Sequence, residues 1–89
     1  MKVWRVTIDP VAARELRKLT SSDRARIMRF LRERIATPED PRRTGHALTG
    51  PFKGLWSYRV GDFRIIASIQ DEIVTVLVLR VGNRRDIYE

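Results

Sequence analysis

The last seven residues of the chain, NRRDIYE, place two arginines and a tyrosine directly after an apolar, strand-like run, IVTVLVLRVG. A guanidinium can grip a phosphate through two parallel hydrogen bonds, and a phenol can stack on a base or exchange a proton. Arg84, Arg85 and Tyr88 therefore have the chemistry needed to hold an RNA backbone and act on it.

A second pair of arginines flanks the short turn VGDF further upstream. In a hairpin closed by Val60 and Phe63, Arg59 lies directly opposite Arg64. Like charges that face each other across a hairpin are destabilising, and an anion bound between them removes the repulsion. We expect an anion site here; the alternative is two solvated arginines that splay apart.

Three strand-like runs must position these residues: 54–60, 63–70 and 73–82. The links between them are too short for crossovers, so the runs are predicted to form antiparallel hairpins. The last strand carries Arg80 alongside 63–70 and brings the tail to the same sheet face. Among the converging guanidiniums we expect no carboxylate.

The N-terminal half reads as one strand and two helices. Residues 3–8 alternate as a strand does, and Asp9-Pro10 then opens a helix that runs to about Leu19. Ser21 or Ser22 is expected to cap a second helix, SDRARIMRFLRERIAT, which Pro38 ends. The apolar positions expected to be buried on these helices are Ala12, Leu16, Leu19, Ile27, Leu31 and Ile35.

Residues 38–51, PEDPRRTGHALTGP, are polar and rich in turn formers, which predicts a loop. It contains Arg42, Arg43 and the single histidine, His46. A lone loop histidine is more often a surface residue than a catalytic base, so we do not expect His46 in the site.

The order β-α-α-β-β-β predicts one α+β domain over residues 1–89. We expect an antiparallel sheet of about four strands, packed in two layers on the N-terminal helical hairpin.

Composition narrows the function classes. The formal net charge is +7, and most of the 18 basic residues are arginine, which favours a polyanionic partner such as nucleic acid, although an arginine-rich genome would give the same excess. The chain has no cysteine, which excludes thiolate catalysis and cysteine-bound zinc. There is no apolar run of about 20 residues and no signal-like N-terminus, so we expect a cytoplasmic protein without membrane contact.

The segment LTGPFKGLWSYRVGDFRIIASIQDEIVTVLVLRVGNRRDIY resembles the RelE/ParE superfamily of bacterial and archaeal toxins, and RelE most closely. The family pattern is L-x-G, a hairpin of the form L-W-R-x-R-V-G-D-Y-R, and a strand that ends V-G-H-R-R-D-V-Y. The upstream β-α-α order also matches, so the resemblance covers essentially the whole chain. Two positions depart from the pattern: Ser57 replaces its first arginine, and Asn83 replaces its histidine.

The resemblance implies a type II toxin that cleaves mRNA in the ribosomal A site, by attack of the 2′-hydroxyl on the adjacent phosphate, with no metal or cofactor. It implies that Arg64 and Arg84 hold the scissile phosphate, that Arg59 orients the next phosphate or donates a proton, and that Tyr88 transfers a proton. The further residues expected to contact RNA are Lys53, Ser57, Arg80, Asn83, Arg85, Arg42 and Arg43.

The implied partners are mRNA, ribosomal RNA and a cognate RelB-like antitoxin with an acidic toxin-binding segment. Two other functions remain open. One is a ParE-like gyrase poison, which does not need the arginine–tyrosine cluster; the other is a non-catalytic RNA-binding domain.

Overall fold

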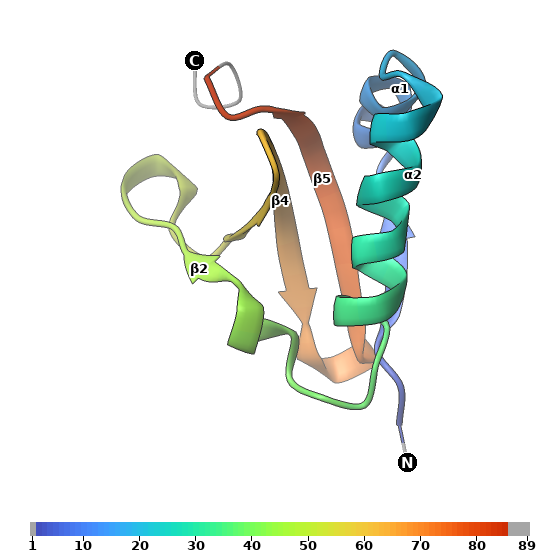
Figure 1. Ribbon diagram of the computed structural model, residues 1–89. Coiled ribbons are helices and arrows are strands. Elements are labelled where there is room, and N and C mark those ends of the chain that lie inside the picture. Colours follow the sequence, from blue (N-terminus) through green and yellow to red (C-terminus); the bar gives the residue numbers. More distant parts are fainter. Residues whose placement is uncertain (1, 86–89) are drawn as a thin grey trace.

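The computed structural model describes residues 2–85 and places two helices against one face of a five-stranded sheet (Figure 1). The sheet order is β1-β5-β4-β3-β2. The elements are β1 (Arg5–Ile8), α1 (Pro10–Arg17), α2 (Ser21–Phe30), β2 (His46–Ala47), β3 (Trp56–Val60), β4 (Phe63–Gln70) and β5 (Thr75–Asn83). This arrangement confirms the predicted α+β class.

The first helix begins where the sequence predicts. The Asp9 carboxylate accepts a hydrogen bond from the Val11 N–H at 2.9 Å, and Pro10 is the first helical residue. The helix ends at Arg17, slightly before the predicted Leu19, and Arg24 of the second helix donates to the carbonyls of Leu16 and Leu19. These bonds hold the start of α2 against the end of α1.

The predicted cap of the second helix was displaced by one residue. Thr20, rather than Ser21 or Ser22, is the N-cap, because its hydroxyl is placed to accept the Asp23 N–H three residues later, at 3.1 Å. Beyond Phe30, the helix continues as a π-helical turn, Leu31–Ile35.

The core lies between the helices and the sheet. Five of the six predicted helix positions are buried, and Leu19 is partly buried; they pack against Tyr58, Ile65, Ala67, Val76, Val78 and Val81 from the sheet. Tyr58 is fully buried and donates its hydroxyl hydrogen to the Pro41 carbonyl at 2.8 Å. Burial raises the pKa of Tyr58 to about 12. This tyrosine ties the 3-10 turn Pro41–Thr44 to the sheet.

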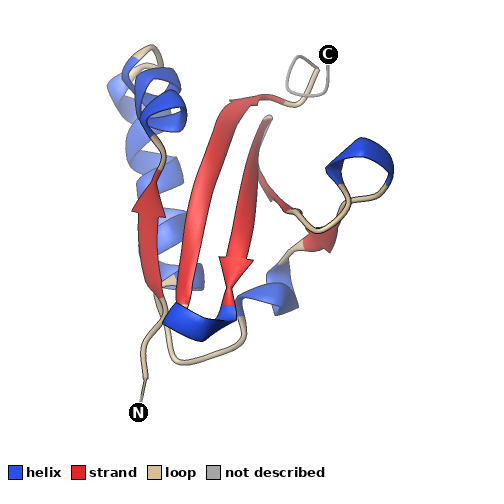
Figure 2. Cartoon of the chain, turned by 180° about the vertical axis from the view of Figure 1, so that it is seen from behind, coloured by secondary structure: helices blue, strands red, loops and turns tan. Residues whose placement is uncertain are grey.

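The sheet differs from the prediction in two ways. It is mixed, because β1 pairs with β5 in parallel, with Arg5 opposite Thr75. It also has a fifth strand, β2, which pairs with β3 inside the segment predicted to be a loop. The view from behind in Figure 2 shows this short strand at the sheet edge, opposite to β1.

A β-bulge in β5 determines which face of the sheet its later residues point to. Ile66 pairs with Arg80 but Ala67 pairs with Val78, so Leu79 is an extra residue in β5. Strict alternation from Val78 would point Arg80 into the core and Val81 away from it. The bulge reverses this, and Val81 is buried while Arg80 is exposed.

Within the described residues, no helix is both long enough and apolar enough to span a bilayer.

Candidate functional site

The β3–β4 hairpin confirms the predicted register. Val60 pairs with Phe63 and Arg59 pairs with Arg64, so the two arginines share one face of adjacent strands. Gly61 makes the turn with a φ of 59°, which favours glycine. We call this face, which points away from the helices and carries Arg59 and Arg64, the basic face.

The end of β5 lies beside the same turn. Gly82 pairs with Arg64, and the main-chain N–H of Arg84 donates to the Asp62 carbonyl at 3.0 Å. The Nε atom of Arg84 is buried and has no hydrogen-bond partner within residues 2–85. A buried donor without a partner costs about 1–3 kcal/mol of stability, so this guanidinium is suited to donate a hydrogen bond to a bound anion.

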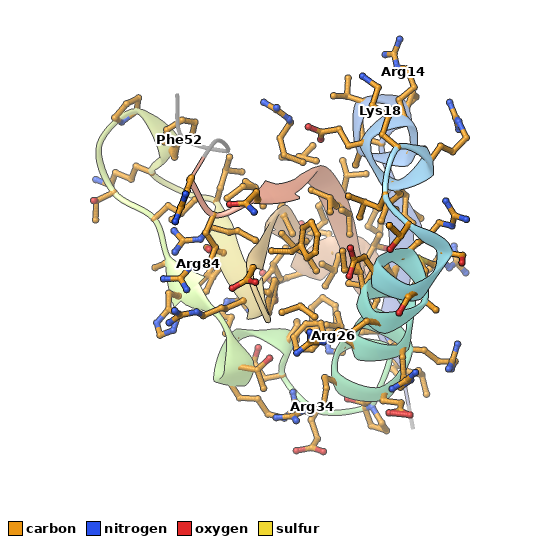
Figure 3. All side chains as sticks on the ribbon, turned by 45° about the horizontal axis from the view of Figure 1, so that its top comes forward. Arg14, Lys18, Arg26, Arg34, Phe52 and Arg84 are labelled. Carbon is orange, nitrogen blue, oxygen red and sulfur yellow. The ribbon has the colours of Figure 1, made fainter. Side chains whose placement is uncertain are left out.

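Figure 3 shows Arg84 and Phe52 on the side of the molecule opposite to Arg14 and Lys18, at the first helix. Lys53 follows Phe52 in the exposed segment after the 3-10 turn Gly50–Phe52. Asn83 accepts the Arg85 N–H on its side-chain oxygen at 3.0 Å, which fixes the main chain directly after Arg84. Tyr88, the predicted proton-transfer residue, lies outside the described residues, so its role remains a prediction.

His46 reaches the basic face, contrary to the interpretation of the sequence. It pairs with Ser57 across β2 and β3, and residues paired in this way share a face, so His46 lies on the same side as Arg59. The expectation that this face offers no imidazole was wrong. A two-residue strand is too short to show alternation, so the sequence pattern could not predict on which face His46 lies. Ser57 itself is 4% exposed, which leaves little of it for RNA contact.

Three arginines predicted to contact RNA form ion pairs with carboxylates in the structure. Arg42 hydrogen-bonds Asp71 at 2.6 Å and Asp40 at 3.2 Å, and its guanidinium lies 5.8 Å from the centre of the Trp56 ring. The hydrogen bond with Asp71 raises the pKa of Arg42. Arg43 pairs with Glu39 at 3.0 Å.

Arg80 is the third, and its position corrects the expectation of a patch free of carboxylates. It forms hydrogen bonds with Glu15 at 3.0–3.3 Å, and the Glu15 carboxylate also accepts the Val81 N–H at 3.0 Å. Burial alone would raise the pKa of Glu15, but these hydrogen bonds and the Arg80 charge hold it below its ordinary value. Arg80 therefore fastens α1 to β5 beyond the end of β1.

Within the described residues, the structure brings part of the predicted site together. The assembled site consists of Arg59, Arg64 and Arg84 at the hairpin end, with Asn83 and Arg85 beside them and His46 on the same face. Within residues 2–85, no three histidine or acidic side chains come close enough together to hold a metal ion.

Comparisons with known proteins identify the family. Residues 6–88 match the family model described as the ParE toxin of the type II toxin–antitoxin system parDE. The chain is 34% identical to Toxin RelG of Mycobacterium tuberculosis over 96% of its own length and 95% of that protein. It is 29% identical to Toxin RelE of the same organism over 96% and 86% of the two chains.

Solved structures agree with this. The toxin–antitoxin complex RelBE2 of M. tuberculosis matches with a TM-score of 0.86 and 32% identity, over 97% of each chain. The isolated E. coli RelE toxin matches with a TM-score of 0.71 and 25% identity, over 96% of this chain and 90% of that one. The chain thus belongs to the RelE/ParE superfamily and is the toxin of a type II toxin–antitoxin system.

Proposed function

We propose that this toxin is a ribosome-dependent endoribonuclease that cleaves mRNA in the A site and thereby stops translation in the cytoplasm. Curated relatives named RelG and RelE support this reading. The observation that carries it is the convergence of three arginines: Arg59 pairs with Arg64, and Arg84 is held to the turn between them by its bond to Asp62. Three guanidiniums at one hairpin end suit the charge of a phosphate under attack.

The proposed reaction begins with attack by the ribose 2′-oxygen on the adjacent phosphorus. The bond from phosphorus to the 5′-oxygen breaks, and a 2′,3′-cyclic phosphate and a 5′-hydroxyl remain. Arg64 and Arg84 hold the phosphate and offset the negative charge that grows on its oxygens in the transition state. Arg59 orients the neighbouring phosphate.

Two proton transfers accompany this exchange: one from the 2′-hydroxyl and one to the 5′-oxygen. Tyr88 remains our proposed base, because guanidiniums such as those of Arg84 and Arg85, close to it in sequence, would favour the charged form of its phenol. His46 is a second candidate, since it lies on the basic face and an imidazole can act as a general acid or base. No metal or cofactor is required in this scheme.

Much of the rate should come from positioning. Holding the 2′-oxygen in line with the leaving 5′-oxygen can supply several kcal/mol, and the ribosome can provide part of that alignment. The test compares single-turnover cleavage of free mRNA with cleavage of the same mRNA on programmed ribosomes. We expect fast cleavage on ribosomes only; equal rates would contradict the proposal.

The matched family model, named for ParE, favours a second function, that of a gyrase poison. The two are separated by incubating the purified toxin with gyrase and supercoiled DNA, and in parallel with programmed ribosomes. Gyrase-dependent DNA cleavage with intact mRNA would replace the nuclease proposal. The combined Arg64→Ala and Tyr88→Phe variant tests the third option, since growth inhibition that survives both changes indicates a non-catalytic binding domain.

For the antitoxin, we propose a docking surface between β1 and α2. A groove of about 320 Å³ is lined by Trp4, Val6, Ile8, Met28, Leu31 and Ala36, with Arg5 and Arg32 at its polar margin. An apolar groove with basic margins fits the apolar stripe of an acidic amphipathic helix. Arg5→Glu with Arg32→Glu should weaken antitoxin binding while leaving cleavage unchanged; unaltered antitoxin affinity would contradict this placement.

A further inference from the structure

A second cavity lies on the opposite side of α2, between that helix and the end of β3. Its volume is about 480 Å³, within the range of ligand-binding pockets. Figure 3 shows Arg26 and Arg34 on the helical segment that forms one wall of it. The residues that line it are Arg26, Arg29, Phe30, Glu33, Arg34, Thr44, Arg59, Val60 and Gly61.

The lining is strongly cationic. Four arginines face a single carboxylate, that of Glu33. Within residues 2–85, none of these four forms an ion pair, whereas Arg42, Arg43 and Arg80 are each bound to an acidic side chain. The arginines that pair with acidic side chains and the four that line the cavity therefore form two separate groups.

The hairpin turn is shaped around one of these arginines. A Cβ atom built on Gly61 would lie 2.7 Å from Nη1 of Arg26 and 2.9 Å from its Cζ. The absence of a side chain at Gly61 thus allows the Arg26 guanidinium to lie against the turn. This contact places a charge from α2 next to the hairpin that carries Arg59 and Arg64.

Arg59 connects the cavity to the candidate cleavage site. It pairs with Arg64 on the basic face and also lines the cavity. The pairing of β2 with β3 reaches only Trp56 and Ser57, so β2 does not cover the edge of β3 at Arg59 and Val60. An RNA strand held at Arg59 can therefore continue across this uncovered edge into the cavity.

We propose that this cavity is a second phosphate-binding subsite, which holds the backbone of the bound RNA strand next to the scissile phosphate. The inference rests on the proposed RNA substrate. An acidic amphipathic helix is another polyanion that arginines bind, but it also needs an apolar groove, and the lining here is mostly polar and charged. The apolar groove between β1 and α2 meets that need instead.

The test measures binding of a fluorescein-labelled single-stranded RNA whose 2′-O-methyl riboses lack the attacking hydroxyl. Dissociation constants for wild type, for Arg26→Gln with Arg29→Gln, and for Arg14→Gln are measured by anisotropy over a range of salt concentrations. Arg14 is exposed on α1 and does not line the cavity, so its variant controls for the loss of one positive charge outside the cavity. Equal unfolding midpoints establish that the variants are folded.

Each phosphate contact on single-stranded nucleic acid contributes about 0.7 to the slope of log K against log salt. The double variant should lose about 1.4 of this slope, and Arg14→Gln should leave it unchanged. Glu33→Gln should tighten binding, because it removes the one negative charge of the lining. An unchanged slope in the double variant, or no measurable RNA binding by wild type, would overturn the subsite.

Two further readouts separate this inference from the proposed function. Cleavage on programmed ribosomes tests the nuclease proposal without reference to the cavity. If the wild type cleaves mRNA but the double variant keeps the full salt slope, the function stands and the subsite falls. If the double variant instead loses affinity only for the cognate antitoxin, the cavity binds an acidic peptide and the inference is wrong.

Discussion

The main-chain N–H of Arg84 donates to the carbonyl oxygen of Asp62 at 3.0 Å, and this bond fastens the end of β5 to the β3–β4 turn. The turn separates Arg59 from Arg64 in sequence but not in space. Because backbone bonds set this arrangement, substitutions of the three guanidiniums should leave the fold intact.

Removal of either phosphate-holding guanidinium should therefore affect the reaction rather than stability. Arg64→Ala and Arg84→Ala should each lower single-turnover cleavage on programmed ribosomes by about 10²–10³-fold, the usual loss of one transition-state donor. Arg14→Ala, which removes an equal charge from α1, should cleave like wild type. Wild-type rates in both site variants would exclude these arginines from the chemistry.

The buried hydroxyl of Tyr58 predicts a loss of stability at alkaline pH. Its pKa is raised by burial to about 12 from 10.0, so the folded state binds the phenolic proton more tightly than the unfolded state does. This contribution is complete below pH 10 and disappears as pH rises toward 12.

Tyr58→Phe removes both the titration and the hydrogen bond to Pro41. The variant should be about 1 kcal/mol less stable at neutral pH and should lose stability less steeply above pH 10. Urea unfolding at a series of pH values measures both effects. Parallel pH profiles for the two proteins would contradict the assignment.

Gly61 and Gly50 form a matched pair for testing the contact with Arg26. Both have positive φ, 59° and 63°, but a Cβ at Gly50 would meet no atom within 4 Å, whereas at Gly61 it would meet Arg26. Each alanine variant should lose about 1 kcal/mol from backbone strain. Gly61→Ala should be the less stable of the two and should also bind RNA more weakly; equal behaviour would show that the contact has no role.

The Glu15 carboxylate predicts a sensitivity to acid. Its pKa is below the ordinary 4.5, so the stabilisation it gives is complete above that value and is lost as pH falls through the folded-state pKa. Glu15→Gln should flatten the decline of stability in acid, and Glu72→Gln, at an exposed residue, should not. Thermal unfolding between pH 3 and pH 6 measures the difference.

Local patterns predicted much of the fold. The Asp9-Pro10 cap, five of the six apolar helix positions and the Arg59–Arg64 register were confirmed, and each depends on neighbours a few residues away. The parallel pairing of β1 was missed because its partner β5 lies about 70 residues further along the chain, and nothing local encodes strand direction.

The site was predicted in part for the same reason. Arg59 and Arg64 follow from one hairpin, but the commitment of Arg80 to Glu15 depends on a helix and a strand that are distant in sequence. The pairing of His46 with Ser57 depends on a strand of two residues, which has no period to detect. Composition indicated the surplus of arginine but could not indicate which guanidiniums have acidic partners.

The extra residue in β5, Leu79, determines both which later residues face the core and which face the candidate site. Without the bulge, regular alternation through Leu79 would turn Arg80 inward and Val81 outward. Gly82 and Arg84 would exchange sides with Asn83 in the same step. A single irregularity in one strand thus sets the phase of everything after it. A toxin that lacks Leu79 should keep this phase, because Arg80 then follows Val78 directly and stays on the outer face.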